Sequence, residues 1–581
     1  MIALFGRDDY AALGIASILD IEKIPYRRIS TLAEHDQDLL VAVGTDLSAE
    51  ESLRIAGTPS LVFHGGADFA RRVFAASDVA TENRPCAIPL SEPIWPEAVR
   101  DIAARFGKRC LCLPLAPVCE TGPLSSAALL ARTEPDYPSG REAQAAIARR
   151  DNCVWSLIDC GTAFTNLMTE DYLPAHRRHG PSSRPKALAR QAAEHLYYSA
   201  PKFVRQWAQR TSYNLLERQL RLEGAQASEY PVDATGWLLI ELVKSLIKLA
   251  AGSLVRLERW PNPYRAAASL THDVEPRRYA YTRGLERLLH EVAALGYGAA
   301  LGLVAHASDR FLTDDVIAQL NGHEIMCHGL THRGEVVWGR AQAVEGMQQA
   351  RVRLQRRLRR RISGYRSPRL DRSSDLAAAL DHCEFDYDSS YPDVDRENVR
   401  HFGGGVRLNV PYRPPVDGGA SGLRPSRCLE LPLTAPDCIQ PLLAGQSEKV
   451  LRSTVEVKAS FVREVGGLYV ALVHAGVFGD EDATVRSAHL RFMYQQFMHP
   501  DVWLAGIEQI VEWWRAREAV RVSLQSGTVQ VHNDGSQPVV GVRVIVGYDA
   551  DETVLPVPPL APGEGARLSV PCGDICIPST P

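Results

Sequence analysis

Short apolar runs alternate with longer amphipathic stretches over the first 180 residues. They are Ile2–Phe5, Tyr10–Ile21, Leu39–Val43, Ala49–Ile55, Ser60–Phe63 and Cys110–Leu115. This alternation of strand-like and helix-like patterns is typical of βαβ units, so it predicts a small open α/β domain over residues 1–180. No Gly-x-Gly-x-x-Gly or P-loop pattern accompanies the strands, so nucleotide binding is not indicated and we expect an accessory role.

The next segment, residues 181–262, has the pattern of a linker followed by helices. Pro181–Pro185 is a linker-like run, and the residues after it are rich in Ala, Leu, Arg and Gln. The most apolar stretch, Trp237–Val255, carries Glu241, Lys244 and Lys248 at helical spacing. Charges on one helical face predict an amphipathic helix and exclude a transmembrane segment.

The last segment, residues 518–581, alternates apolar and polar positions. Val520–Leu524, Thr528–His532 and Gly541–Gly547 show this pattern, with turn residues at Asn533–Gly535. Period-two alternation between turns predicts a small C-terminal β-sandwich. The segment has no cluster of aromatic residues, so packing or protein interaction is the expected role.

The central segment, residues 263–517, contains the residues that could take part in a reaction. Ala266–Leu270 is largely apolar and is followed directly by the polar run Thr271–Glu275, as in a buried parallel strand that emerges at its functional end. Since side chains alternate along a strand, Asp273 and Glu275 share a face.

Two histidines, His328 and His332, lie four residues apart downstream of this strand. On one face of a helical turn both could reach a metal ion at ~2.0–2.1 Å. Two His and one carboxylate leave positions open for water and substrate, which is typical of a catalytic metal site. Such a pair alone is also compatible with ordinary core or surface histidines.

The motifs that follow make the metal site the favoured interpretation. They are Gly364–Pro368, Phe385–Ser390, Leu429–Pro432 and Leu472–His474. The ordered series resembles the polysaccharide deacetylases, the NodB-homology group similar to carbohydrate esterase family 4. The first motif is a Thr-His-Asp-x-acid variant, and the resemblance covers roughly residues 263–515.

This resemblance implies an α/β fold with a distorted (β/α) barrel as the catalytic domain. It also implies that Asp273 is the general base, that Arg366 orients it and that His474 is the general acid. Glu275, His328 and His332 would be the metal ligands, although relatives of this variant carry Asp at the position of Glu275. Four further positions are expected near the substrate: Tyr365, Pro368, Asp388 and Glu430.

The implied reaction is hydrolysis of an N-acetyl, or similar small acyl, group on an amino sugar of a glycan or glycan precursor. A divalent metal lowers the pKa of bound water to about 7 and polarises the carbonyl. Zinc is the leading candidate, and cobalt, nickel, manganese and iron are compatible with the same ligands. Two alternatives stay open: a cyclic amide or imide hydrolase of the same superfamily, and a degenerate protein that binds glycans without turnover.

Composition adds limits to this picture. The chain has 581 residues, 45% of them hydrophobic, 23% charged, and a formal net charge of −4. This length predicts several domains, and the charge does not favour nucleic acid as a partner. The basic run Arg351–Arg361 is interpreted as a solvated helix face. Met1–Gly6 lacks the long apolar region of a secretory signal, so we expect a cytoplasmic protein; nothing indicates its oligomeric state.

Overall fold

The computed structural model describes the chain in segments. They are residues 1–6, 9–36, 39–44, 47–77, 79–121, 124, 128–133, 144–172, 201, 204, 207–208, 211, 231–332, 339–393, 405–419, 422–435, 447–475, 483–525 and 527–571. The predicted linker at 181–185, and most of the predicted helical segment after it, lie outside these residues. No helix in the described segments is long and apolar enough to cross a membrane.

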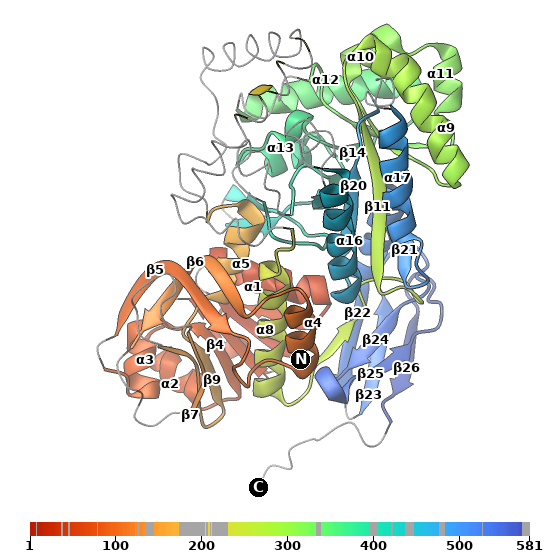
Figure 1. Ribbon diagram of the computed structural model, residues 1–581. Coiled ribbons are helices and arrows are strands. Elements are labelled where there is room, and N and C mark those ends of the chain that lie inside the picture. The colour runs from red at the N-terminus through yellow and green to blue at the C-terminus, as the bar shows by residue number, and fades with distance from the viewer. Residues whose placement is uncertain are drawn as a thin grey trace.

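The N-terminal part is an open α/β sheet, as predicted, and lies at the lower left of Figure 1. Its strand order is β2-β1-β3-β4-β9-β8-β7, parallel from β2 to β9 and antiparallel for β8 and β7. The strands are β1 (Ile2–Gly6), β2 (Tyr26–Ile29), β3 (Leu39–Gly44), β4 (Ser60–His64), β7 (Ala128–Arg132), β8 (Ala145–Arg150) and β9 (Cys153–Ser156). The helices are α1 (Asp9–Glu22), α2 (Ala49–Ala56), α3 (Gly66–Phe74), α4 (Glu97–Arg105) and α5 (Cys160–Thr169). A separate hairpin pairs β5 (Ala80–Pro89) with β6 (Cys110–Glu120).

The central part is a parallel β-barrel surrounded by helices, which confirms the predicted distorted (β/α) barrel. Its strands are β11 (Ala266–Val274), β12 (Ala300–Leu303), β13 (Glu324–Cys327), β14 (Gly364–Tyr365), β15 (Tyr387–Asp388), β18 (Leu429–Glu430), β19 (Leu433–Ala435) and β20 (Leu468–Leu472). β18 pairs with β15, whereas β19 pairs with β20. The segment from Leu429 to Ala435 therefore joins the two edges of the sheet and closes the barrel.

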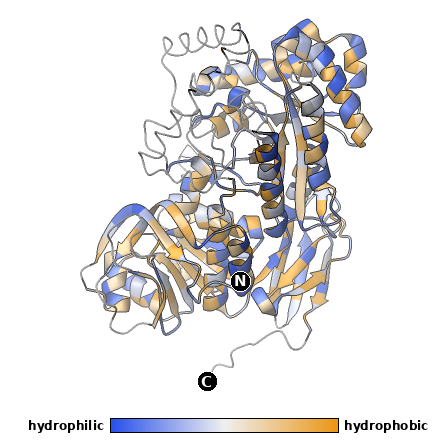
Figure 2. Ribbon diagram, in the orientation of Figure 1, coloured by the Kyte–Doolittle hydropathy of each residue, from blue (hydrophilic) through white to orange (hydrophobic). Residues whose placement is uncertain are grey.

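Helices and short strands surround this barrel. The helices are α9 (Leu285–Leu295), α10 (Ala305–Phe311), α11 (Asp314–Gln319), α12 (Arg340–Leu358), α13 (Leu376–His382), α16 (Glu448–Glu464), α17 (Ala483–Phe497) and α18 (Ile507–Glu518). β21 (Val502–Leu504) pairs with β11, and β16 (Pro415–Asp417) pairs with β17 (Leu423–Pro425). Figure 2 shows that these outer helices mix polar and apolar residues, as expected of helices that bury one face only.

The C-terminal part consists of two three-stranded antiparallel sheets. One contains β22 (Val520–Gln525), β23 (Thr528–Asn533) and β26 (Gly565–Ser569), and the other contains β10 (Val255–Leu257), β24 (Arg543–Val546) and β25 (Thr553–Pro556). Valines of both sheets form one buried cluster. Strand β10 comes from the segment predicted to be helical, and that prediction is wrong here because Val255 and Leu257 complete this apolar cluster.

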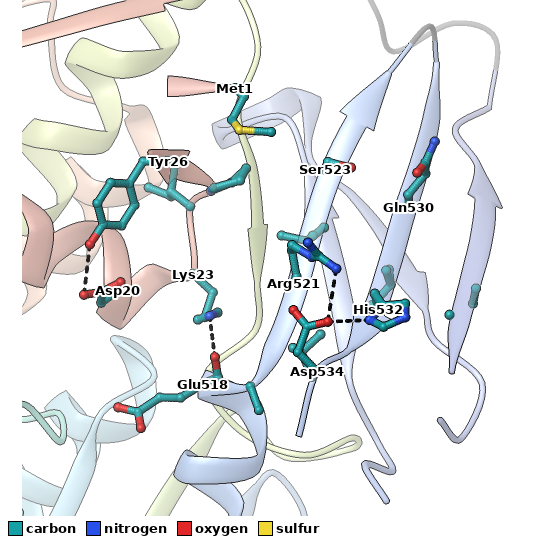
Figure 3. A pocket seen from close by; sticks show the side chains of 18 of the residues that line it. Met1, Asp20, Lys23, Tyr26, Glu518, Arg521, Ser523, Gln530, His532 and Asp534 are labelled. Carbon is teal, nitrogen blue, oxygen red and sulfur yellow. Dashed lines mark hydrogen bonds and ion pairs between the residues drawn. The ribbon is translucent and has the colours of Figure 1, made fainter. Parts of the chain in front are cut away.

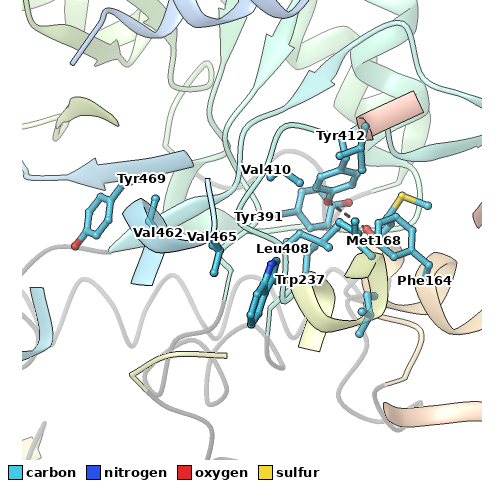
Figure 4. Close-up of a cluster of buried hydrophobic side chains, with 14 of the residues drawn as sticks. Phe164, Met168, Trp237, Tyr391, Leu408, Val410, Tyr412, Val462, Val465 and Tyr469 are labelled. Carbon is cyan, nitrogen blue, oxygen red and sulfur yellow. Dashed lines mark hydrogen bonds between the residues drawn. The ribbon is translucent and has the colours of Figure 1, made fainter. Parts of the chain in front are cut away.

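The N-terminal part and the barrel share one hydrophobic core. Figure 4 shows Phe164 and Met168 of α5 close to Tyr412, with Trp237 of α8 (Thr235–Ala251) nearby. Tyr412 also donates a hydrogen bond to the Met168 carbonyl at 3.2 Å. Buried apolar contact of this kind fixes the two parts relative to one another.

Candidate active site

The candidate catalytic residues lie at the carboxyl ends of the barrel strands. Asp273 is the second-last residue of β11. His328 and Arg366 directly follow β13 and β14, and His474 lies two residues after β20. The carboxyl ends of parallel barrel strands meet at one face, where active sites of such barrels form. The structure thus brings together residues that are up to 201 positions apart.

Asp273 is a buried carboxylate held between two nitrogen groups. Its side chain is 2% exposed, its Oδ1 lies 3.3 Å from Arg366 Nη1, and its Oδ2 lies 3.7 Å from His328 Nε2. Burial opposes ionisation, but His328 and Arg366 outweigh it and lower the pKa of the Asp273 carboxyl. Asp273 is therefore ionised near neutral pH, as a general base must be.

Arg366 is fully buried and its guanidinium is held by several acceptors. Besides Asp273, it donates to the Ser389 carbonyl and Ser389 Oγ, each at 2.9 Å, and to Thr271 Oγ1 at 2.7 Å. Neither Thr271 nor Ser389 was predicted as a partner of Arg366. Thr271 could have been found, since it shares the strand face of Asp273, whereas Ser389 gave no signal.

Glu275 faces two imidazoles at the more open side of the site. Its Oε2 lies 3.8 Å from His332 Nε2, and its Oε1 lies 3.7 Å from His474 Nε2. Burial raises the pKa of Glu275, but His332 and His474 outweigh this effect and lower it. Burial lowers the pKa of His332 to about 4, so its ring is neutral at pH 7 and can offer a lone pair.

The backbone between His328 and His332 does not form the predicted helical turn. Gly329 has φ 77° and His332 has φ 63°, both in the left-handed region. The two rings nevertheless lie close, with centroids 5.0 Å apart. A strained backbone at a non-glycine residue such as His332 is typical of functional sites. The prediction of proximity is confirmed, and the prediction of a helix is wrong because Gly329 turns the chain.

The donor groups are compatible with a divalent metal. His328 Nδ1 lies 3.0 Å from the Arg366 carbonyl, which only accepts hydrogen bonds, so the lone pair of the neutral ring is on Nε2. Two donors on one tetrahedral ion lie about 3.4 Å apart, close to the 3.8 Å between Glu275 Oε2 and His332 Nε2. Among the described residues, no group of three or more His, Cys, Asp or Glu side chains is spaced so that it could hold a metal ion. The chemistry of the donor groups, rather than their spacing, is what fits a divalent metal.

Asp388 and Glu430 form a second, fully buried carboxyl pair. They are register partners on β15 and β18, with 2% and 1% exposure. Asp388 Oδ1 accepts from Ser390 Oγ at 2.6 Å, and Glu430 Oε1 accepts from the Tyr391 amide at 3.0 Å. Burial raises the pKa of Asp388 to about 6, and burial with the neighbouring Asp388 raises the pKa of Glu430 well above its usual range. At least one of the two is therefore protonated at mildly acidic pH.

Tyr365 and Pro368, predicted near the substrate, are buried. Tyr365 is 0% exposed and packs in the core, its ring centroid 5.4 Å from that of Phe385. Side chains alternate on β14, so Tyr365 points away from the side where Arg366 lies. This placement does not support a substrate contact for Tyr365. Pro368 lies two residues after Arg366 and begins the short 3₁₀ turn Pro368–Leu370.

The segment after this turn is anchored to the N-terminal part. Arg372 donates to both carboxylate oxygens of Glu170, at 2.7 and 2.9 Å, and both side chains are buried. The intervening residues Arg369 and Leu370 have φ of 60° and 57°. The N-terminal part therefore contributes to the placement of the loop that carries Arg366.

The basic run on α12 is paired with nearby carboxylates and carbonyls. Arg353 lies 3.1 Å from Asp309, and Arg357 lies 3.2 Å from Asp314. Arg351 donates to the Cys383 carbonyl. Arg353 and Arg357 are 44% and 30% exposed, which fits the interpretation of the run as a solvated helix face.

Comparison with known proteins gives distant similarities only. No family model and no curated protein matches the chain. Among solved structures, the putative polysaccharide deacetylase from Mycobacterium smegmatis is 20% identical over 46% of this chain and 96% of that chain, with a TM-score of 0.37. Puue allantoinase is 18% identical over 45% and 93%, with a TM-score of 0.36. Agd3, described as a novel carbohydrate deacetylase, is 10% identical over 98% of both chains, with a TM-score of 0.37.

These similarities are too distant to assign a function to this chain. The barrel topology and the positions of the six residues at its carboxyl face are properties of this chain.

Proposed function

We propose that the protein is a metal-dependent hydrolase that removes an N-acetyl, or similarly small acyl, group from an amino sugar of a glycan or glycan precursor. Acetate and a free amine would be the products. The observation that carries the proposal is the buried Asp273 carboxylate, oriented by Arg366 and adjacent to the imidazole of His328. The imidazoles of His332 and His474 face the neighbouring Glu275.

Asp273 is suited to accept a proton from a water molecule. Its low pKa keeps it ionised, and the guanidinium of Arg366 fixes the carboxylate rotamer. The hydrogen bonds from Arg366 to Ser389 and Thr271 hold the guanidinium itself. Asp273 therefore has a fixed direction in which it can remove a proton.

His474 is suited to protonate the leaving amine. It is 24% exposed, so it stands at the solvent side of the site, and it faces Glu275. An amine leaves poorly unless it is protonated, and an imidazolium can donate that proton.

Glu275, His328 and His332 would hold the divalent metal. Bound there, it would supply Lewis-acid activation of water and of the acyl carbonyl. Zinc remains the leading candidate, and cobalt, nickel, manganese and iron fit the same donors. The extra methylene of Glu275, relative to Asp, still permits zinc ligation.

The proposal is tested by measuring metal content and acetate release on purified protein. Substrates are N-acetylated oligosaccharides and nucleotide sugars, and the variants are Asp273→Asn and His328→Ala, with the exposed His290→Ala as matched control. We expect one metal per chain in the wild type and in His290→Ala, and loss of metal and of acetate release in His328→Ala. Metal binding without acetate release would favour cyclic amide substrates. A wild type that cannot be loaded with metal would contradict the hydrolase and favour a glycan-binding protein.

A further inference from the structure

A cleft lined by both polar and apolar residues lies between the N-terminal part and the C-terminal sheet β22-β23-β26. Its volume is about 920 Å³. The end of α1 and the start of β2 form one wall, and the three strands form the other (Figure 3). A cavity of this size falls in the range of small-molecule and oligosaccharide sites.

The sheet wall is a continuous polar face. Register pairs Arg521 with His532, Ser523 with Gln530, and Gln530 with Arg567. These five side chains therefore lie on the same face of the sheet, whereas the intervening valines lie in the core beneath. The face presents amide, hydroxyl, imidazole and guanidinium groups side by side toward the cleft.

The opposite wall contributes Asp20, Lys23 and Tyr26. Tyr26 donates to Asp20 Oδ2 at 3.2 Å, and Lys23 donates to the Glu518 carbonyl at 2.7 Å (Figure 3). Asp20 is accessible to water, yet the surrounding protein raises the pKa of its carboxyl to about 6. In a concave surface, neighbouring protein atoms remove part of the water around a carboxyl that is still accessible, which raises its pKa.

The charges in the cleft are balanced. Asp534 pairs with Arg521 at 3.1 Å and with His532 at 2.5 Å, and Asp20 and Glu518 lie across from them. Carboxylates interspersed among the basic groups oppose the binding of phosphate or another strong anion. A ligand rich in hydroxyl and amide groups fits such a surface, because both donors and acceptors are at hand.

We propose that this cleft is an accessory carbohydrate-binding site for a segment of the glycan chain on which the protein acts. The identity of the ligand rests on the proposed function. Planar polar side chains such as Gln530 and Arg521 would bond sugar hydroxyls from the sheet wall of the cleft.

The cleft lies at the end of the barrel opposite the catalytic residues. The C-terminal sheets contact the residues just before β11, where the Asn262 amide donates to the Gly541 carbonyl at 2.8 Å. Asp273 lies seven residues beyond Ala266, the first residue of β11, which corresponds to roughly 23 Å along the strand at the usual rise. The cleft would therefore hold one segment of the polymer without contacting the bond that reacts.

The test measures binding of an array of neutral, N-acetylated and anionic oligosaccharides to the full-length Asp273→Asn protein. Two independent changes are introduced in that background: the double substitution Gln530→Ala and Arg567→Ala, and the filling substitution Ser523→Trp. The matched control is Ser569→Ala, on the same face of the same sheet and outside the cleft. Thermal melting verifies that each variant is folded.

We expect neutral or N-acetylated oligosaccharides to bind, with affinity lowered about tenfold by both cleft changes and unchanged in the control. Equal affinity in cleft variants and control, or binding of no oligosaccharide, would overturn the inference. Retention of strongly anionic glycans only would contradict the argument from charge. Acetate release by the wild type is measured separately. If acetate is released and the cleft changes do not alter binding, only the accessory site is wrong. If binding depends on the cleft but no acetate is released, the accessory site stands and the proposed hydrolase is wrong.

Discussion

Arg366 Nη1 lies 3.3 Å from Asp273 Oδ1, and both side chains are almost completely buried. The charge of the guanidinium offsets the cost of burying the carboxylate, and Thr271 and Ser389 fix the geometry of the pair. This contact links strands β11 and β14 at the centre of the candidate site.

We predict that Arg366→Lys lowers the kcat for acetate release by about 10²-fold. Lysine keeps the charge but lacks the planar fork that bonds Asp273, Thr271 and Ser389 together. Steady-state kinetics and thermal melting of the same preparation measure the effect. A lysine variant with the wild-type rate would show that charge alone suffices.

Gly302 is expected to be essential for the position of Asp273. A Cβ at Gly302 would lie 2.5 Å from Asp273 Oδ1, which is too close without movement of the carboxylate. Gly302→Ala should therefore lower kcat by about tenfold or more while the protein remains folded and binds metal. Circular dichroism and metal content serve as controls, and unchanged kcat would mean that Asp273 tolerates displacement.

The ion pair between Arg372 and Glu170 should make a large contribution to stability. Arg372→Met leaves Glu170 buried without its cation, so we expect a loss of about 3–5 kcal/mol of unfolding free energy. Arg372→Met combined with Glu170→Met should recover most of it. Urea denaturation measures both.

The exposed pair Arg27 and Asp36 is the matched control. Arg27→Met should cost less than about 1 kcal/mol, because solvent screens surface pairs. Equal losses in the two arginine variants would contradict the role assigned to burial.

The Asp388 and Glu430 pair should make stability depend on pH. Both carboxyls have raised pKa values when folded, about 6 for Asp388, so the folded protein holds protons that the unfolded chain releases from about pH 4 upward. Their contribution to stability is thus complete below pH 4 and declines as pH rises through 6. Glu430→Gln, which mimics the protonated acid, should reduce this decline when urea midpoints at pH 4.5 and 7 are compared with those of the wild type. An identical pH dependence would contradict the raised pKa values assigned to this pair.

The resemblance of the ordered motifs to the polysaccharide deacetylases predicted the barrel and the meeting of the candidate residues. Side-chain alternation is a local property and could be predicted from the residues themselves. Asp273 and Glu275 share a strand face, and their partners follow later strands at the same end of the barrel. The turn at Gly329 was not predicted, since histidine spacing alone does not distinguish a helix from a loop.

The sequence pattern did not predict the packing between elements that are far apart in the chain. Helix α8 was predicted to expose Glu241 and Lys244 to water, but both are buried and lie 2.7 Å apart, and Lys244 also lies 3.6 Å from Glu22 of the N-terminal part. The polar face of α8 is covered by α1 and by Tyr548, which donates to Glu241 at 2.6 Å. Such contacts depend on elements hundreds of residues apart.

The most direct test is the rate of acetate release by Asp273→Asn at the same metal occupancy as the wild type, on any substrate that the wild type hydrolyses. We predict a fall of about 10²–10⁴-fold in kcat with metal retained, because the amide cannot accept the proton. A variant that keeps the wild-type rate would show that Asp273 is not the base and would contradict the proposed chemistry.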